Sequence, residues 1–83
     1  MRVIAVDYDG IINSGGNPIK SNINKVNTLF DDKDNYIVIY TARNRNLYHT
    51  VFKQLTDWEV KFHALVMEKM RADYYVDDKT MIL

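Results

Sequence analysis

Two aspartates one residue apart, Asp7 and Asp9, stand directly after a short apolar run near the start of the chain. The run, Val-Ile-Ala-Val at 3–6, is rich in β-branched residues and predicts a buried strand. Because side chains alternate along a strand, both carboxylates are expected on one side, where they repel each other unless a cation or proton lies between them. Gly10 then lets the backbone turn away. The pattern suits an oxygen-ligand site for a hard cation such as Mg²⁺, and it is also typical of a turn whose aspartates accept backbone hydrogen bonds.

The composition is that of one small globular domain spanning residues 1–83. An apolar fraction of 47% and a charged fraction of 27% are ordinary for a soluble protein, which argues against disorder. The net charge is zero, whereas a protein that binds nucleic-acid backbone usually carries a basic excess. The chain has no apolar run long enough to cross a membrane, no apolar signal region and no cysteine. We therefore expect no nucleic-acid or membrane partner and a cytoplasmic location.

Hydrophobic periodicity divides the chain into alternating strands and helices. Strands are predicted at 2–8, 36–40, 61–66 and 73–78. One helix is predicted to begin after an N-cap at Ser21, and a second is predicted over 46–57. Residues 10–20, which contain Gly-Gly and the only proline, are predicted to form a flap-like loop.

This order of elements predicts an α/β domain with a mainly parallel, four-stranded sheet. Crossovers between parallel strands should be right-handed, and the first strand, which is apolar on both faces, should be central. The aromatic residues Tyr8, Phe52 and Trp58 are expected to pack in the core, because large rings at strand or helix spacing are more often buried than used as ligand platforms.

Polar residues follow three of the predicted strands. They are Asp7 and Asp9, Thr41 and Arg43, and Asp77 and Asp78. The carboxyl ends of parallel strands lie on one edge of the sheet, where open α/β sheets bind their ligands. Lys69, just before the last predicted strand, could join them.

Each of these residue types has a role if the ligand is a phosphate ester. A carboxylate can attack phosphorus and form an aspartyl-phosphate, and a second carboxyl can move protons between leaving group and water. Mg²⁺ neutralises carboxylates and phosphoryl oxygens together. A threonine hydroxyl and a lysine ammonium stabilise the charge on the group being transferred.

Four short motifs in this order resemble those of the haloacid-dehalogenase (HAD) superfamily of phosphatases and phosphotransferases. They are Asp-Tyr-Asp-Gly at 7–10, Ile-Tyr-Thr-Ala-Arg at 39–43, Lys-Met-Arg-Ala-Asp at 69–73 and Tyr-Val-Asp-Asp-Lys at 75–79. The match covers nearly the whole chain and looks most like the small capless members and the deoxyribonucleotidase-like branch. The chain departs from the pattern at Ile11, where a threonine is common, and at Met70, where a proline is common. Residues 11–20 are too short for the usual cap domain.

The resemblance implies a three-layer, doubly wound sheet with no cap, and it assigns roles to single residues. Asp7 would be the nucleophile and a metal ligand. Asp9 would be the general acid/base and would bind metal through its backbone carbonyl. The phosphate would be held by Thr41, Ala42 and Lys69. Arg43 is not a fixed part of the superfamily pattern, but Arg43 and Arg45 are placed where they could bind this phosphate, a second phosphate or a nucleotide. Asp77 and Asp78 would complete the Mg²⁺ site, and which of them binds the metal directly is left open.

The sequence therefore predicts a Mg²⁺-dependent phosphohydrolase that acts on phosphate monoesters, such as nucleotides or sugar phosphates, through an aspartyl-phosphate. The alternative is a phosphate- or nucleotide-binding module with little or no turnover. A receiver-type signalling domain would carry its phosphorylated aspartate after a middle strand, and the order of motifs argues against it. The expected partner is a small phosphorylated substrate, and a homodimer could cover an exposed sheet edge.

Overall fold

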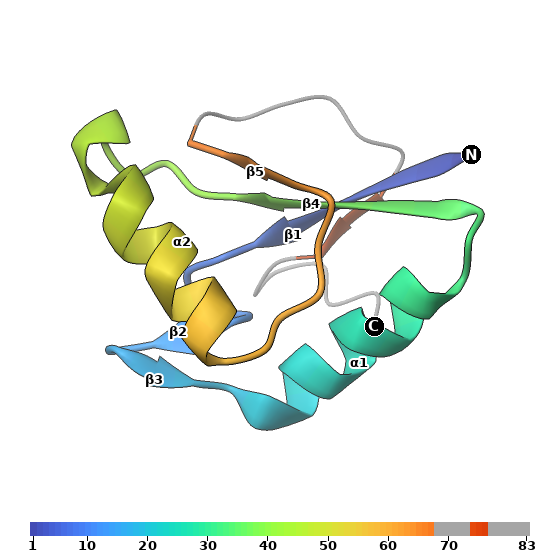
Figure 1. The fold of residues 1–83 in the computed structure, drawn as a ribbon, viewed down its shortest axis with the longest axis horizontal. Coiled ribbons are helices and arrows are strands. Elements are labelled where there is room, and N and C mark those ends of the chain that lie inside the picture. The colour runs from blue at the N-terminus through green and yellow to red at the C-terminus, as the bar shows by residue number, and fades with distance from the viewer. Residues whose placement is uncertain (68–73, 77–83) are drawn as a thin grey trace.

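The central element of the fold is strand β1 (Arg2–Asp7), which pairs in parallel with a neighbour on each side (Figure 1). The computed structural model describes residues 1–67 and 74–76. Within them the main sheet has the order β5–β4–β1–β6, with all three pairings parallel. Its other strands are β4 (Asn35–Tyr40), β5 (Ala64–Val66) and β6 (Tyr74–Val76). The expected α/β class, the parallel sheet and the central first strand are confirmed.

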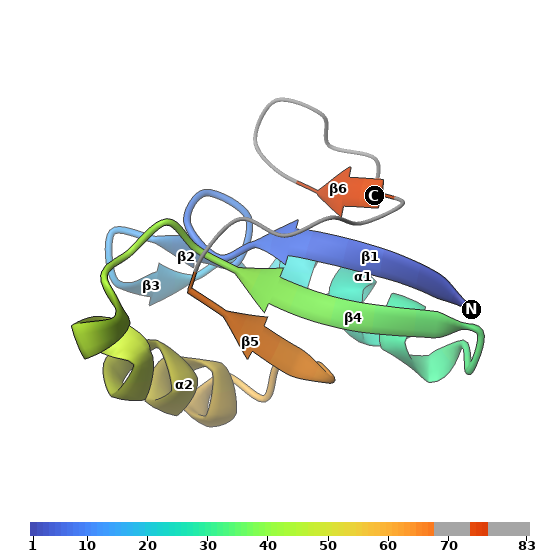
Figure 2. The same ribbon diagram turned by 90° about the horizontal axis from the view of Figure 1, so that it is seen from above.

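Two helices connect the strands in the described part of the chain. Helix α1 (Lys20–Asp31) lies between β1 and β4, and helix α2 (Tyr48–Asp57) lies between β4 and β5. A single 3₁₀ turn, η1 (Arg45–Leu47), leads into α2. Both helices are on the same side of the sheet (Figures 1 and 2). The three-layer, doubly wound arrangement therefore stays a prediction. No described helix combines the length and the apolar character needed to cross a membrane.

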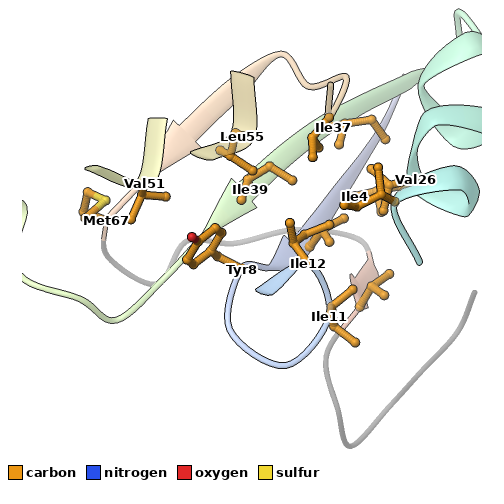
Figure 3. Packing of buried hydrophobic residues seen from close by; sticks show 14 residues of the cluster. Ile4, Tyr8, Ile11, Ile12, Val26, Ile37, Ile39, Val51, Leu55 and Met67 are labelled. Carbon is orange, nitrogen blue, oxygen red and sulfur yellow. The ribbon is translucent and has the colours of Figure 1, made fainter. Parts of the chain in front are cut away.

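The hydrophobic core lies between the two helices and one face of the sheet (Figure 3). Alternate residues of the two central strands face the helices, as the period of a strand requires. They are Ile4 and Val6 of β1, opposite Ile37 and Ile39 of β4. Val26 of α1 and Val51 and Leu55 of α2 pack against this face and are fully buried. Tyr8 is also fully buried, as expected, and Trp58 is partly buried with its ring parallel to that of Tyr8. The prediction for Phe52 is wrong, because this side chain is 43% exposed on α2.

The start of helix α1 differs from the prediction. The N-cap is Ile19, which has no side-chain cap, and Ser21 lies inside the first turn. Two contacts with the preceding loop hold this end in place. The Ile19 N–H donates to Ile12 O at 2.8 Å, and Asn22 Nδ2 donates to Ile11 O at 3.0 Å. Asn22 is buried, so a tertiary contact replaces the local cap that Ser21 was expected to supply.

Strand β5 is shorter than predicted because its expected first half makes other hydrogen bonds. His63 Nδ1 accepts a hydrogen bond from the Ile37 N–H at 2.9 Å, and the His63 N–H donates to Ile37 O at 2.9 Å. The Lys61 N–H donates to Asn27 Oδ1 of α1 at 2.8 Å. Residues 61–63 are thus bound to a neighbouring strand and helix without being part of a regular ladder.

The predicted flap-like loop at 10–20 contains a small hairpin. Strands β2 (Asn13–Ser14) and β3 (Asn17–Pro18) pair antiparallel. The two residues between them, Gly15 and Gly16, have φ of +59° and +91°. Positive φ at both positions is what a two-residue hairpin turn of type I′ requires, and glycine adopts it without a steric penalty. The hairpin begins within four residues of Asp9, so it lies beside the end of β1.

Candidate functional site

The candidate site lies at the C-terminal ends of the adjacent strands β1 and β4. Beyond β1 the ladder continues for one bond, from the Tyr8 N–H to Tyr40 O at 2.8 Å. This bond places the next residue of each strand side by side, and Thr41 Oγ1 donates to Asp9 Oδ2 at 3.2 Å. Thr41 is buried and its N–H donates to Val66 O of β5. Asp9 and Thr41, which belong to two of the sequence motifs, are therefore brought together as expected.

Arg43 makes the strongest contact with Asp9. Its Nε donates to Oδ2 at 3.0 Å and its Nη2 donates to Oδ1 at 2.8 Å, so the carboxylate is held at both oxygens. The Arg43 N–H also donates to Thr41 Oγ1 at 3.2 Å, which ties the start of the loop to the same cluster. A two-point pair between guanidinium and carboxylate fixes the relative orientation of the two groups as well as their distance.

A ring lies beneath this ion pair. The guanidinium carbon of Arg43 is 5.4 Å from the ring centroid of Tyr8, within the range of a cation–π contact. The Tyr8 hydroxyl donates to Gln54 Oε1 of α2. The Trp58 ring lies parallel to that of Tyr8, with centroids 6.5 Å apart. Helix α2 thereby positions the ring that supports Arg43.

Asn13 is a site residue that the motifs did not identify. Its Nδ2 donates to Asp9 Oδ1 at 3.2 Å, and its Oδ1 accepts from the Gly16 N–H at 2.9 Å. The side chain is buried and links the tip of the hairpin to the carboxylate. A signal was present, because an asparagine shortly before Gly-Gly often accepts a hydrogen bond from the turn that follows. Its second bond, to Asp9, had no such signal.

These contacts control the charge of Asp9. Burial raises the pKa of the carboxyl, but hydrogen bonds from Arg43, Asn13 and Thr41, together with the charge of Arg43, outweigh burial and lower the pKa below its usual 3.8. The same hydrogen bond to Asp9 raises the pKa of Arg43. Asp9 is thus an ionised acceptor next to a fixed cation, and 44% of its side chain is exposed. Such a group can accept a proton or orient a hydroxyl, and the adjacent cation can attract an anion.

The other predicted site residues differ in what the structure says of them. Asp7 is the last residue of β1, opposite Tyr40, and is half-buried. Since β1 ends there, strand alternation does not extend to Asp9, which is positioned by its own contacts. Ala42 is exposed.

Three predicted residues, Lys69, Asp77 and Asp78, lie outside the described residues. Within the described ranges, no three His, Cys, Asp or Glu side chains gather as a metal site. The predicted Mg²⁺ site depends on Asp77 and Asp78, so it stays a prediction.

The loop after β4 also lines a cavity of about 550 Å³. Its walls are formed by Ala42, Arg43, Asn44, Arg45, Asn46 and Met67. Guanidinium and amide groups predominate in this set, which suits an anionic ligand with hydrogen-bond acceptors. Arg43 belongs both to this cavity and to the cluster around Asp9.

Replacing Arg43 by methionine is expected to raise the pKa of Asp9 toward or above its usual value. The substitution removes two hydrogen bonds and a positive charge, and the burial that opposes ionisation remains. With Arg43 present, the lowered pKa stabilises the fold above pH 3.8, and this contribution is lost as the pH falls through the lowered value. The measurement is the carboxyl ¹³C shift of Asp9 against pH in metal-free protein, with Arg2→Met as the control. An unchanged midpoint in Arg43→Met would contradict the role given to this ion pair.

The chain was compared with protein-family models, curated proteins and solved structures. No protein-family model, no curated protein and no solved structure matches the chain.

Proposed function

We propose that the chain is a Mg²⁺-dependent phosphohydrolase of the HAD type that acts on small phosphate monoesters. The proposal includes the capless, doubly wound form of that fold and a cytoplasmic location. The observation that carries it is the 3.2 Å contact between Thr41 Oγ1 and Asp9 Oδ2. These residues come from two motifs more than thirty positions apart in the sequence, and a turn that used its aspartates only for local hydrogen bonds would not need Thr41.

Each residue at this edge of the sheet has a proposed task. The carboxylate of Asp7 attacks phosphorus, the bond to the leaving oxygen breaks, and an aspartyl-phosphate forms. Asp9 supplies the proton to the leaving group and later takes one from the water that cleaves the aspartyl-phosphate. Thr41 and Lys69 hold the oxygens of the group being transferred. The outcome is an alcohol and inorganic phosphate, with Asp7 regenerated.

The described residues fit the proposed metal. Both aspartates offer oxygen donors, which a hard cation prefers, and the carboxylate of Asp9 is already held by Arg43, Thr41 and Asn13. Asp9 would therefore offer a metal its backbone carbonyl, in keeping with the role that the motif implies. Asp7 would contribute a carboxylate oxygen, with Asp77 and Asp78 as further ligands. When bound, Mg²⁺ would neutralise the carboxylates and the phosphoryl oxygens.

One observation favours a second function, a phosphate- or nucleotide-binding module with little turnover. A general acid must carry a proton, and the pair with Arg43 lowers the pKa of Asp9 and so keeps it ionised. If that pair persisted with a ligand bound, the leaving group would lack its proton donor. The two functions therefore differ in what happens to the Asp9–Arg43 pair.

A panel of phosphate monoesters, including nucleotides and sugar phosphates, separates the two functions. With Mg²⁺ we expect release of inorganic phosphate, and removal of the metal by a chelator should lower the rate by roughly a hundredfold or more. Re-addition of Mg²⁺ should restore the rate. Saturable binding of a panel member without any product would favour the binding module. If no member of the panel binds and none yields product, both proposals are overturned.

A further inference from the structure

Arg43 takes part in two features of the site, the ion pair with Asp9 and the cavity that follows β4. Its guanidinium holds both carboxylate oxygens of Asp9, at 2.8 and 3.0 Å. The same residue also lines the cavity of about 550 Å³, together with Asn44, Arg45 and Asn46. Arg43 therefore belongs both to the ion pair with Asp9 and to the lining of the cavity, so an anion bound in the cavity would lie near its guanidinium.

The pair between Arg43 and Asp9 is open to competition. The two side chains are 35% and 44% exposed, and ion pairs at such exposure are weakened by solvent and salt. A phosphate dianion carries more charge than a carboxylate and offers the same two-point geometry to a guanidinium. A phosphate group in the cavity would therefore compete directly with Asp9 for Arg43.

Asp9 has other donors that would keep it in place if Arg43 moved. Thr41 Oγ1 donates to Oδ2 and Asn13 Nδ2 donates to Oδ1, both at 3.2 Å. Each carboxylate oxygen would thus retain one hydrogen bond, so loss of Arg43 would not leave an unpaired acceptor. The ring of Tyr8, fixed by Gln54, would still lie below the guanidinium and limit how far it travels.

We propose that Arg43 is an exchangeable positioning residue that holds Asp9 in the absence of ligand and passes its guanidinium to the phosphate group of a bound ligand. The exchange leaves Asp9 held by Thr41 and Asn13 alone. This inference rests on the proposed function for its ligand class, and it reconciles the paired carboxylate with a role in proton transfer, because Asp9 is released only when a phosphate is present.

The exchange can be observed without turnover, by NMR of ¹⁵N-labelled protein titrated with inorganic phosphate in the absence of Mg²⁺. The reporter is the Nε–Hε signal of Arg43, assigned by its loss in Arg43→Lys. We expect this signal to shift saturably, while potassium chloride of equal ionic strength leaves it in place. The Asn13 side-chain amide signals should persist, since that contact is retained. An Arg43 signal that stays unchanged as phosphate is added would overturn the inference, whether or not other signals move.

A double-mutant cycle tests whether Asp9 and phosphate share the same arginine. With Arg43 present, Asp9→Asn should tighten phosphate binding by about tenfold, because the guanidinium is released and one negative charge is removed. In the Arg43→Met background, the same change should tighten binding only about two- to threefold, through removal of the charge. Equal factors in the two backgrounds would show simple repulsion and would contradict the exchange. Dispersed amide spectra establish that each variant is folded.

The failure of this inference can be told apart from the failure of the proposed function. A static Arg43 signal in a protein that hydrolyses phosphate monoesters would leave the phosphohydrolase in place and remove the exchange. A shifting Arg43 signal in a protein without turnover would retain the exchange and favour the binding module.

Discussion

Asparagine in place of Asp7 is expected to reduce turnover of phosphate monoesters by roughly a thousandfold or more. The amide has nearly the shape of the carboxylate but lacks its negative charge, so it cannot form the aspartyl-phosphate. Asp7 ends the central strand of the sheet, and the exchange of one oxygen for nitrogen should leave the pairing of β1 with β4 unchanged. The measurement is the initial rate of phosphate release with Mg²⁺, together with binding of inorganic phosphate.

The matched control for this change is Asp57→Asn. Asp57 is the last residue of α2 and is paired with Lys53 at 2.8 Å, and its exposed side chain belongs to no part of the site. We expect this variant to retain the full rate, because exposed pairs at this spacing contribute at most about 0.5 kcal/mol to stability. Retention of activity by Asp7→Asn would exclude an aspartyl-phosphate on Asp7. Activity in both variants at the same low level would identify a contaminating phosphatase.

The order of strands and helices could be predicted because each buried segment has a distinct period. The apolar run before Asp7 predicts a central strand, and β1 does pair on both sides. The spacing of apolar residues after η1 predicts a helix ending at Asp57, as observed. What could not be predicted are ends set by tertiary contacts. Ser21 is a good N-cap by type, but Asn22 anchors the helix to the preceding loop.

The site was predictable where it depends on strand geometry and not where it depends on loops. Parallel strands end at one edge of a sheet, so the proximity of Asp9 and Thr41 follows from the order of the motifs. The two-point pair between Arg43 and Asp9 depends on the path of residues 42–44, for which the sequence has no periodic signal. Asn13 reaches Asp9 only because the hairpin folds back toward β1. The site as observed is therefore more tightly bound around Asp9 than the motifs alone indicate.

Truncation of Leu55 to alanine is expected to have the largest effect on stability that we consider. The side chain is fully buried and lies beside Ile39 in the core between α2 and the sheet (Figure 3). Removal of a buried leucine costs about 2–5 kcal/mol, from lost burial and the cavity left behind. A chain of this length has a free energy of unfolding on the order of 4–12 kcal/mol. Leu55→Ala should therefore remove a large share of it, and urea unfolding followed by the fluorescence of Trp58 measures the change.

Leu47→Ala is the matched control, since it makes the same change at a leucine that is 41% exposed in η1. The loss of unfolding free energy should stay below about 1 kcal/mol, because about two-fifths of this residue is already in contact with water and less buried apolar area is removed than at Leu55. The difference between the two variants isolates the contribution of burial in α2. Helix α2 also carries Gln54, which holds the Tyr8 ring below Arg43. Leu55→Ala should therefore lower the affinity for inorganic phosphate even at urea concentrations at which the protein is still folded. Similar costs for the two leucines would mean that α2 is not packed on the sheet as described, and the support of Arg43 by Tyr8 would fail with it.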